Sequence, residues 1–350
     1  MSKTDLSAAL KRFPKADLGA HQTPIDTLPR LGARLGIDLQ VKRDDTLTLA
    51  MGGNKIRQLE YYLGPAFQQG ADTVLITGAV QSNFVRLTTA AARKLGMKAV
   101  VQLENRVDLQ DVFHQGSGNV LLDHLLGAEI HHFPEGENEA AADANLDRLA
   151  DRLRAEGRKP YVIHLGIEHP PTGGLGYAEC AAECYTQIQT TGDAPDLVVI
   201  ASGSGLTHAG FLSGARAVGW DVPVYGICVR RDAAQQRARI IRRAGEIDRL
   251  LGCGTSVAET EVMVDDTTLN PGYGQMNEQV ADAIGFAARD EALLLDPVYT
   301  GRAMAGLISL IKQGVIMQGQ KVLFIHTGGT PAIFAYQTDL MARLNKAEKP

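Results

Sequence analysis

The sequence predicts an α/β protein whose parallel sheets are covered by helices on both faces. Short apolar runs rich in β-branched residues alternate with longer segments of helical periodicity, such as residues 84–95 and 303–312. This alternation is typical of parallel sheets that are buried on both sides. We expect strands at residues 73–77, 98–103, 161–165, 197–202, 224–229 and 322–327. A chain of 350 residues also predicts about two domains.

Three of the expected strands run directly into small or polar turns that open a helix. These turns are TGAVQSN after residue 76, SGSG after residue 201 and HTGGTP after residue 325. Ligands of open α/β sheets bind at the carboxyl ends of the strands, so the turns are the first candidates for a functional site.

Composition excludes several classes of partner. A net charge of −5 gives no reason to expect nucleic acid. The absence of a long apolar run argues against a membrane span, and the polar N-terminus does not resemble a signal peptide, which favours the cytoplasm. The four cysteines form no C-x-x-C pair, so we expect reduced thiols and no metal site. A solvated helix face is the expected place for the basic residues Arg237, Arg239, Arg242, Arg243 and Arg249.

The first chemical motif is the segment MGGNK at residues 51–55. Asn54 is expected to cap a helix, and the two glycines allow the backbone to approach a ligand closely. Lys55 then lies in the first helical turn, where the helix dipole favours loss of the ammonium proton, as a Schiff-base lysine requires. The motif alone is equally compatible with an ordinary exposed lysine.

The second motif is Gln81-Ser82-Asn83. Ser82 and Asn83 suit helix caps, and they also suit a hydroxyl and an amide that bind a substrate carboxylate. Taken alone, the segment favours the caps.

The third motif is SGSGLTHAG at residues 202–210. Its backbone N–H groups and the following helix dipole favour a phosphate. The position that the dinucleotide fingerprint G-x-G-x-x-G requires as glycine is His208, and no G-K-[ST] follows, so one phosphate is more natural than a pyrophosphate.

The fourth motif is DPVYTG at residues 296–301. Pro297 favours an extended entry, and Thr300 is expected to cap the next helix. The phenol of Tyr299 suits an acid or base, although a packed tyrosine beside a cap explains the segment alone equally well.

Together these motifs resemble the D-cysteine desulfhydrase and 1-aminocyclopropane-1-carboxylate deaminase family of pyridoxal-phosphate enzymes. The resemblance extends from about residue 13 to residue 336 and rests on the order of its motifs. They include VKRDD at 41–45, GGNK at 52–55, QSN at 81–83, SGS at 202–204, THAG at 207–210, PGYG at 271–274, DPVYTG at 296–301 and HTGG at 326–329.

The resemblance implies the tryptophan-synthase-β-like fold (fold type II), with two domains that each contain an open, mainly parallel, twisted sheet flanked by helices. Residues 1–55 and 170–350 would form the large pyridoxal-phosphate-binding domain and residues 56–169 the small one, with the cofactor in the cleft between them. A homodimer is likewise implied.

The resemblance also implies roles for individual residues. Lys55, Ser82, Tyr273 and Tyr299 would be catalytic. Cofactor contacts would come from Lys55, Asn83, Gly203, Ser204, Gly205, Leu206, Thr207, Thr300 and Thr327. The substrate, a small amino acid, would meet Gln81, Ser82, Asn83, Phe84, Glu168, His169 and Tyr273.

Position 300 bears on the reaction. The deaminase branch of the family has Glu where this chain has Thr300, which would meet the pyridine nitrogen. A hydroxyl cannot keep that nitrogen protonated as a carboxylate can, so the ring is a weaker electron sink. We therefore expect α,β-elimination to a 2-oxo acid and ammonia, like that of D-cysteine desulfhydrase, rather than opening of a cyclopropane ring. Activity of the L-cysteate sulfo-lyase type is a further alternative.

Three departures from the family pattern lie on the substrate side or in the phosphate loop. Phe84 replaces the usual His, the segment GIEHPP at 166–171 replaces G-G-S-N, and Leu206 replaces a Gly. We expect Phe84 and residues 167–171 to reshape the pocket for a β-substituted amino acid other than D-cysteine.

Two rival classes remain at this point. An NADP-binding oxidoreductase would use residues 202–210 for the dinucleotide and Arg230 and Arg231 for a 2′-phosphate. A non-catalytic, ligand-binding homologue would keep the fold without the activity.

Overall fold

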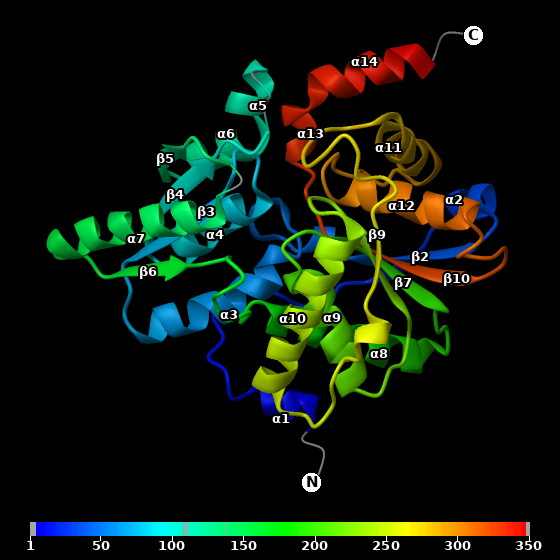
Figure 1. Cartoon of the computed structure of the whole chain (residues 1–350), viewed down its shortest axis with the longest axis horizontal. Helices are drawn as coiled ribbons and strands as arrows, with labels where there is room; N and C mark the ends of the chain where they lie inside the picture. The colour runs from blue at the N-terminus through cyan, green and yellow to red at the C-terminus, as the bar shows by residue number, and fades with distance from the viewer. Residues whose placement is uncertain (1–4, 108, 110, 137, 348–350) are drawn as a thin grey trace.

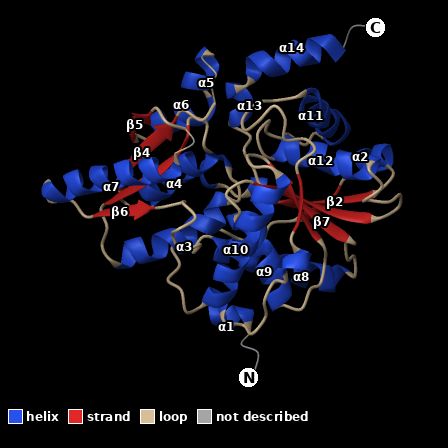
Figure 2. Ribbon diagram, viewed as in Figure 1, coloured by secondary structure: helices blue, strands red, loops and turns tan. Residues whose placement is uncertain are grey.

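The computed structural model describes residues 5–347 except 108, 110 and 137, and two open sheets dominate it (Figure 1, Figure 2). The larger sheet has the strand order β1-β2-β10-β7-β8-β9, in which β1 is antiparallel to β2 and the other neighbours are parallel. Its strands are β1 (Ile25–Thr27), β2 (Asp38–Arg43), β7 (Leu197–Ser202), β8 (Val224–Cys228), β9 (Met263–Asp265) and β10 (Lys321–His326).

The smaller sheet is parallel throughout and has the order β5-β4-β3-β6. Its strands are β3 (Thr73–Ala79), β4 (Lys98–Glu104), β5 (Glu129–Phe133) and β6 (Pro160–Ile163). All four come from the segment predicted as the small domain, and the strands of the larger sheet come from the two segments around it. The domain boundaries themselves stay a prediction.

The helices connect these strands and cover the sheets. The helices of the first half are α1 (Leu6–Leu10), α2 (Pro29–Leu35), α3 (Lys55–Gln68), α4 (Asn83–Lys94), α5 (Val112–Gly116), α6 (Gly118–Leu125) and α7 (Glu139–Ala155). Those of the second half are α8 (Gly174–Thr191), α9 (Leu206–Ala217), α10 (Ala233–Leu251), α11 (Glu278–Glu291), α12 (Thr300–Lys312), α13 (Ala332–Ala335) and α14 (Gln337–Ala347). Three short 3₁₀ turns are η1 (Asp44–Thr46), η2 (Leu49–Met51) and η3 (Glu259–Glu261).

Strand β7 shows why the larger sheet is covered on both sides. Successive side chains of a strand point to opposite faces. Leu197 and Val199 pack with α2, α11 and α12, whereas Val198 and Ile200 pack with α8, α9 and α10. Every residue of β7 is therefore buried, which explains the continuous apolar run in the sequence.

The smaller sheet follows the same rule. Val74 and Ile76 pack against α3 and α4 on one face, and Leu75 packs against Leu146 and Leu153 of α7 on the other. The predicted α/β class with parallel sheets covered on both faces is confirmed, and each of the six expected strands is present.

All four cysteines are free and buried, as the sequence predicted. Among the described residues, no helix is long and apolar enough to cross a membrane.

A buried ion pair joins α3 to η1, the turn that follows β2 of the larger sheet. The guanidinium of Arg57, on α3, donates to both carboxylate oxygens of Asp44, in η1, over 3.0 Å each. Arg57 also donates to Glu183 of α8 over 2.8 Å, and the hydroxyl of Tyr177 donates to Asp44 over 2.7 Å. Asp44 is fully buried, and Arg57 lowers the pKa of its carboxyl group against the opposing effect of burial.

We expect Arg57→Met to destabilise the protein strongly, because the Asp44 carboxylate would stay buried without the guanidinium that pairs with it. Removing one partner of a buried ion pair lowers the free energy of unfolding by about 3–5 kcal/mol. Urea unfolding followed by circular dichroism measures this change. Arg43→Met is the matched control, since Arg43 forms partly exposed pairs with Asp26 and Asp45 whose loss costs about 1 kcal/mol or less. Equal losses in the two variants would contradict the assignment.

Candidate active site

A cavity lies where the carboxyl ends of strands from both sheets converge. The larger sheet contributes the residues that follow β7, β8 and β10, and the smaller sheet contributes those that follow β3, β4 and β6. This is where ligands bind in open α/β sheets, as the sequence predicted.

Lys55 is the first residue of α3, and its amine lies in this cavity. The turn before it depends on glycine, because Gly52 has φ +70° and an added Cβ there would lie 2.2 Å from the carbonyl oxygen of Leu47. The backbone N–H of Gly53 then bonds Asp44 O over 3.1 Å. These contacts hold the start of α3 at the end of the larger sheet.

The surroundings of the Lys55 amine favour its neutral form. The nitrogen lies 3.4 Å from Gln58 Oε1 and 5.0 Å from the centre of the Phe84 ring, and no carboxylate among the described residues pairs with it. Burial lowers the pKa of Lys55 to about 8. Desolvation therefore favours loss of the ammonium proton, in the same direction as the effect expected from the helix dipole.

Asn54 does not cap α3, contrary to expectation, because its side-chain amide donates instead to the hydroxyl of Thr207 over 2.9 Å. Gln58 donates to the same hydroxyl over 2.8 Å. Since the Thr207 oxygen accepts two bonds, its own proton is left to donate toward the cavity that Thr207 lines.

The Gly-rich loop before α9 forms the wall next to Thr207. Gly203, Ser204 and Gly205 line the cavity, and Gly205 adopts φ +94° at the N-terminus of the helix. Backbone N–H groups and the helix dipole make this end of α9 suitable for a phosphate. Leu206 does not line the cavity, because its side chain is buried against the apolar residues of the smaller sheet, so its expected role is limited to its backbone.

The three residues of the QSN segment do not all lie in the cavity. Ser82, Asn83 and Phe84 line the cavity, and the Ser82 hydroxyl also caps α4 by accepting from Val85 N over 3.2 Å. Gln81 turns away, contrary to its predicted substrate contact. Its amide donates to the carbonyl oxygens of His114 and Ser117 and holds α5 and α6 in place.

Two tyrosines face each other in the cavity, Tyr273 from the segment before α11 and Tyr299 from the residue before α12. The hydroxyl groups of Tyr273 and Tyr299 lie 2.9 Å apart, and both residues line the cavity. Burial raises the pKa of Tyr299 well above its usual value, and the neighbouring Tyr273 adds to this shift. The pair therefore holds protons that can be donated to a group bound in the cavity.

Thr300 does not cap α12 as predicted. The carboxylate of Asp296 accepts from the N–H groups of Val298, Tyr299 and Thr300, and the Thr300 hydroxyl donates to Asp296 over 2.7 Å. Thr300 is fully buried and is not among the residues that line the cavity, whereas Thr327 is. The expected contact of Thr300 with the cofactor stays a prediction.

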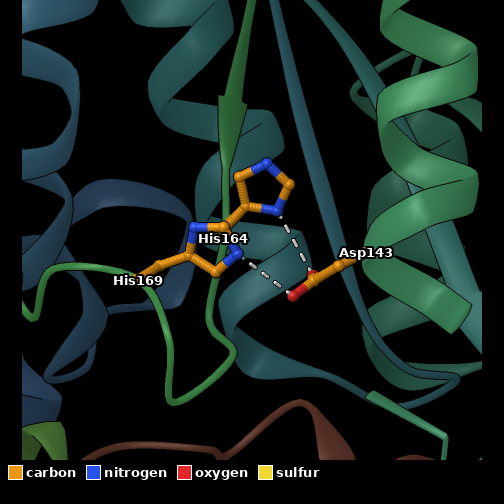
Figure 3. A group of neighbouring side chains, drawn as sticks. All are labelled: Asp143, His164 and His169. Carbon is orange, nitrogen blue, oxygen red and sulfur yellow. Dashed lines mark ion pairs between the residues drawn. The ribbon is translucent and has the colours of Figure 1, made fainter. Parts of the chain in front are cut away.

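The 166–171 loop contains two residues predicted to contact the substrate, and their side chains point in different directions. Glu168 points outward and pairs with Arg242 over 2.8 Å, so it does not line the cavity as expected. His169 stacks on His164 at the edge of the cavity and faces Asp143 (Figure 3).

Four arginines line the same cavity, and the sequence analysis assigned none of them to an amino-acid site. They are Arg106, Arg230, Arg231 and Arg239. Arg230 and Arg231 donate to Glu139 over 2.8 and 2.7 Å, and Arg106 pairs with Glu104 over 2.8 Å. Burial and the neighbouring guanidinium of Arg231 lower the pKa of Arg239 to about 10.

The prediction that the basic residues of α10 form a solvated helix face is therefore only partly correct. Arg239 lines the cavity, and Arg243 is buried, where it donates to the carbonyl oxygens of Gly166 and His169 over 2.7 Å each. Both belong to the side of α10 that faces the cleft, which a run of charged residues does not reveal by itself.

Comparison with protein families identifies what this cavity accommodates. Residues 16–328 match the family described as pyridoxal-phosphate dependent enzyme. The chain belongs to that family. The match rules out the alternative of an NADP-binding oxidoreductase.

Individual relatives show to which group within this family the chain belongs. The chain is 41% identical over 331 residues to a D-cysteine desulfhydrase of Klebsiella pneumoniae, covering 95% of this chain and 98% of the relative. It is 41% identical over 339 residues to a putative 1-aminocyclopropane-1-carboxylate deaminase of Pyrococcus abyssi, covering 97% and 98%. It is thus a pyridoxal-phosphate enzyme of the D-cysteine desulfhydrase and 1-aminocyclopropane-1-carboxylate deaminase group, as its motifs suggested.

Solved structures agree on the fold. An ACC deaminase homologue superposes with a TM-score of 0.84 at 36% identity, covering 97% of this chain and 99% of that one. A fungal L-serine ammonia-lyase from Rhizomucor miehei superposes with a TM-score of 0.65 at 17% identity, covering 93% and 98%, a likeness of fold alone. The predicted fold type II architecture is confirmed.

The residues present fit pyridoxal phosphate. Lys55 offers a buried amine without a carboxylate partner, and the loop at residues 203–205 offers N–H groups at a helix N-terminus. The Thr207 hydroxyl has a proton left to donate to a phosphate oxygen. Asn83 and Thr327 are further polar residues of the cavity lining.

We expect the rate of covalent capture of pyridoxal phosphate by the cofactor-free protein to rise with pH, with its midpoint at about pH 8. Only the neutral amine reacts, and burial lowers the pKa of Lys55 to about 8. A lysine with an ordinary pKa would continue to gain rate up to about pH 10. Stopped-flow absorbance of the visible cofactor band measures this profile. Lys55→Ala is the control, and a visible band that survives in it, with a borohydride adduct on another lysine, would refute the assignment.

Proposed function

We propose that the enzyme catalyses α,β-elimination of a small β-substituted amino acid, giving a 2-oxo acid and ammonia, in the manner of D-cysteine desulfhydrase. The observation that supports this most is the cavity that contains the Lys55 amine, whose pKa burial lowers to about 8, together with the paired hydroxyl groups of Tyr273 and Tyr299. It provides one group that takes a proton and another that donates one.

When bound, pyridoxal phosphate makes the α-proton of an amino acid acidic and accepts the electron pair that the proton leaves behind. Lys55 is the base for that proton, because its amine is neutral and buried near pH 8. Ser82 and Asn83, at the start of α4, bind the substrate carboxylate. The α4 dipole strengthens this contact.

The tyrosine pair donates a hydrogen bond to the leaving group. Tyr299 stays protonated at neutral pH because burial raises its pKa, and Tyr273 fixes the direction of its hydroxyl. A departing thiolate or similar group meets this donor as its negative charge develops.

The carboxylates of the cavity favour elimination over ring opening. Glu104 pairs with Arg106, Glu139 with Arg231, and Asp143 with His164. The position occupied by Glu in the deaminase branch is Thr300, whose hydroxyl donates to Asp296. No described carboxylate of the lining is thus left to protonate the pyridine nitrogen, which makes 1-aminocyclopropane-1-carboxylate deaminase activity the weaker alternative.

We expect elimination to be measurable as 2-oxo acid and ammonia with both enantiomers of cysteine, β-chloroalanine and cysteate as the panel. Because the Phe84 ring lies over Lys55, D-cysteine should not be the best substrate, and Phe84→His should shift the preference toward it. Lactate dehydrogenase coupling measures pyruvate. If D-cysteine matched every other substrate and Phe84→His changed nothing, this role of Phe84 would be wrong; no elimination with any substrate would refute the function.

A second candidate, favoured by the arginines, is elimination of an anionic β-substituent, as in an L-cysteate sulfo-lyase. Four guanidinium groups line the cavity. A guanidinium can bind a sulfonate or phosphate on the substrate side chain through two parallel hydrogen bonds.

We expect Arg230→Gln and Arg239→Gln to lower kcat/KM for cysteate by about 10–100-fold, the equivalent of one charge-assisted hydrogen bond. Turnover of the neutral β-chloroalanine should be nearly unchanged. Arg237→Gln is the matched control on α10, because Arg237 bonds Glu259 O at the surface and does not line the cavity. Equal losses for both substrates, with weaker cofactor retention on gel filtration, would show that these arginines hold the cofactor phosphate instead.

The homodimer expected from the resemblance also stays a proposal. It is supported by exposed apolar side chains on neighbouring helices at one end of the molecule, which are Val112, Leu121, Leu125 and Phe334. Sedimentation velocity distinguishes a dimer from a monomer.

A further inference from the structure

A cluster of one carboxylate and two imidazoles lies at the edge of the cavity, which Asp143 lines (Figure 3). Asp143 comes from α7, His164 follows β6, and His169 belongs to the loop before α8. The two histidine rings stack with centroids 4.1 Å apart and planes 10° apart. Both rings point a nitrogen toward the same carboxylate, as Figure 3 shows.

The spacing of these atoms matches a coordination shell. His164 Nδ1 lies 3.3 Å from one oxygen of Asp143, and His169 Nε2 lies 3.5 Å from the other. All potential ligand atoms of the cluster lie within 4.8 Å of one another. A tetrahedral zinc ion with bonds of about 2.0–2.1 Å separates neighbouring ligand atoms by about 3.3–3.5 Å. Because the two rings lie nearly parallel, one of them must rotate out of the stack for both nitrogens to bind the same ion.

A fourth residue supports the orientation of the ligands. His164 Nε2 lies 3.1 Å from a carboxylate oxygen of Asp147, one turn along α7 from Asp143. A metal-binding histidine commonly donates its other ring N–H to a carboxylate, which leaves the opposite nitrogen as the ligand. The opposite nitrogen here, His164 Nδ1, is buried and has no hydrogen bond of good geometry. A cation would satisfy this atom.

The loop that carries His169 is held in place before any ion binds. Arg243 donates to the carbonyl oxygens of Gly166 and His169 over 2.7 Å each, and Glu246 balances its charge over 2.9 Å.

We propose that Asp143, His164 and His169 form a binding site for a divalent transition-metal ion of the zinc type. Three protein ligands leave at least one coordination position for water or a small anion. The site includes neither Lys55 nor the phosphate loop, but it shares one wall of the cavity with them. Asp143 and Gly166 both line the cavity, so a bound ion would fasten α7 to the 166–171 loop and fix that wall.

The test uses the tag-free, cofactor-loaded enzyme after dialysis against a chelator. Calorimetry with Zn²⁺ should show one equivalent bound, and Co²⁺ should give the strong visible bands of a tetrahedral site. His169→Gln should lower the affinity at least tenfold, and Asp147→Asn should lower it by about 10–100-fold through the orientation of His164. His132→Gln, an exposed histidine on β5, is the control and should leave the affinity unchanged.

Two outcomes would overturn the site: no stoichiometric binding at 0.1 mM Zn²⁺ at about pH 8, or an affinity in His169→Gln equal to that of the His132→Gln control. Thermal unfolding is a second readout that does not depend on catalysis. Saturating Zn²⁺ should raise the melting temperature of the parent enzyme and of His132→Gln, and should leave that of His169→Gln in place.

Discussion

The buried pair between Arg57 and Asp44 is the interaction on which the rest of the site depends. It joins α3, which begins with Lys55, to the carboxyl end of β2, where Asp44 follows the strand. Glu183 and Tyr177 add α8 to the same network. Because Arg57 is only two residues from Lys55, the forked contact with Asp44 determines where the start of α3 lies relative to the larger sheet. A single point charge would not impose that direction.

A second buried arginine ties the same region to the smaller sheet. Arg86 of α4 is fully buried and donates to the carbonyl oxygens of Ala50 and Gly52, in the strained turn that precedes Lys55. Ala50 and Met51 have positive φ values of 41° and 68° there. Positive φ in a residue other than glycine is unfavourable, so neighbouring contacts must hold it. The turn is thus fixed from both sheets at once.

The parts predictable from sequence were those that depend on local pattern. Six strands follow from apolar runs, and the turn at residues 202–205 follows from its small residues at a strand end. What the pattern could not show was how one element faces another. Asn54 looked like a cap, but its side-chain amide donates to Thr207, 153 positions away in the sequence, and it makes no capping bond to its own helix. Arg239 looked solvated because the cavity wall it meets comes from other strands. Glu168 and Gln81 were assigned by analogy with a motif, and their side chains point out of the cavity.

The distribution of roles between the two sheets has a consequence for evolution. Lys55 begins α3, which packs on the smaller sheet, and the phosphate loop follows β7 of the larger one, whereas Phe84 belongs to α4 and the 166–171 loop follows β6. Substitutions in the second set change the shape and charge of the substrate side without touching the groups that retain the cofactor. A single ancestral scaffold can in this way diversify among amino acids while it conserves its chemistry, and protein engineers can use the same division to alter specificity without rebuilding the catalytic lysine.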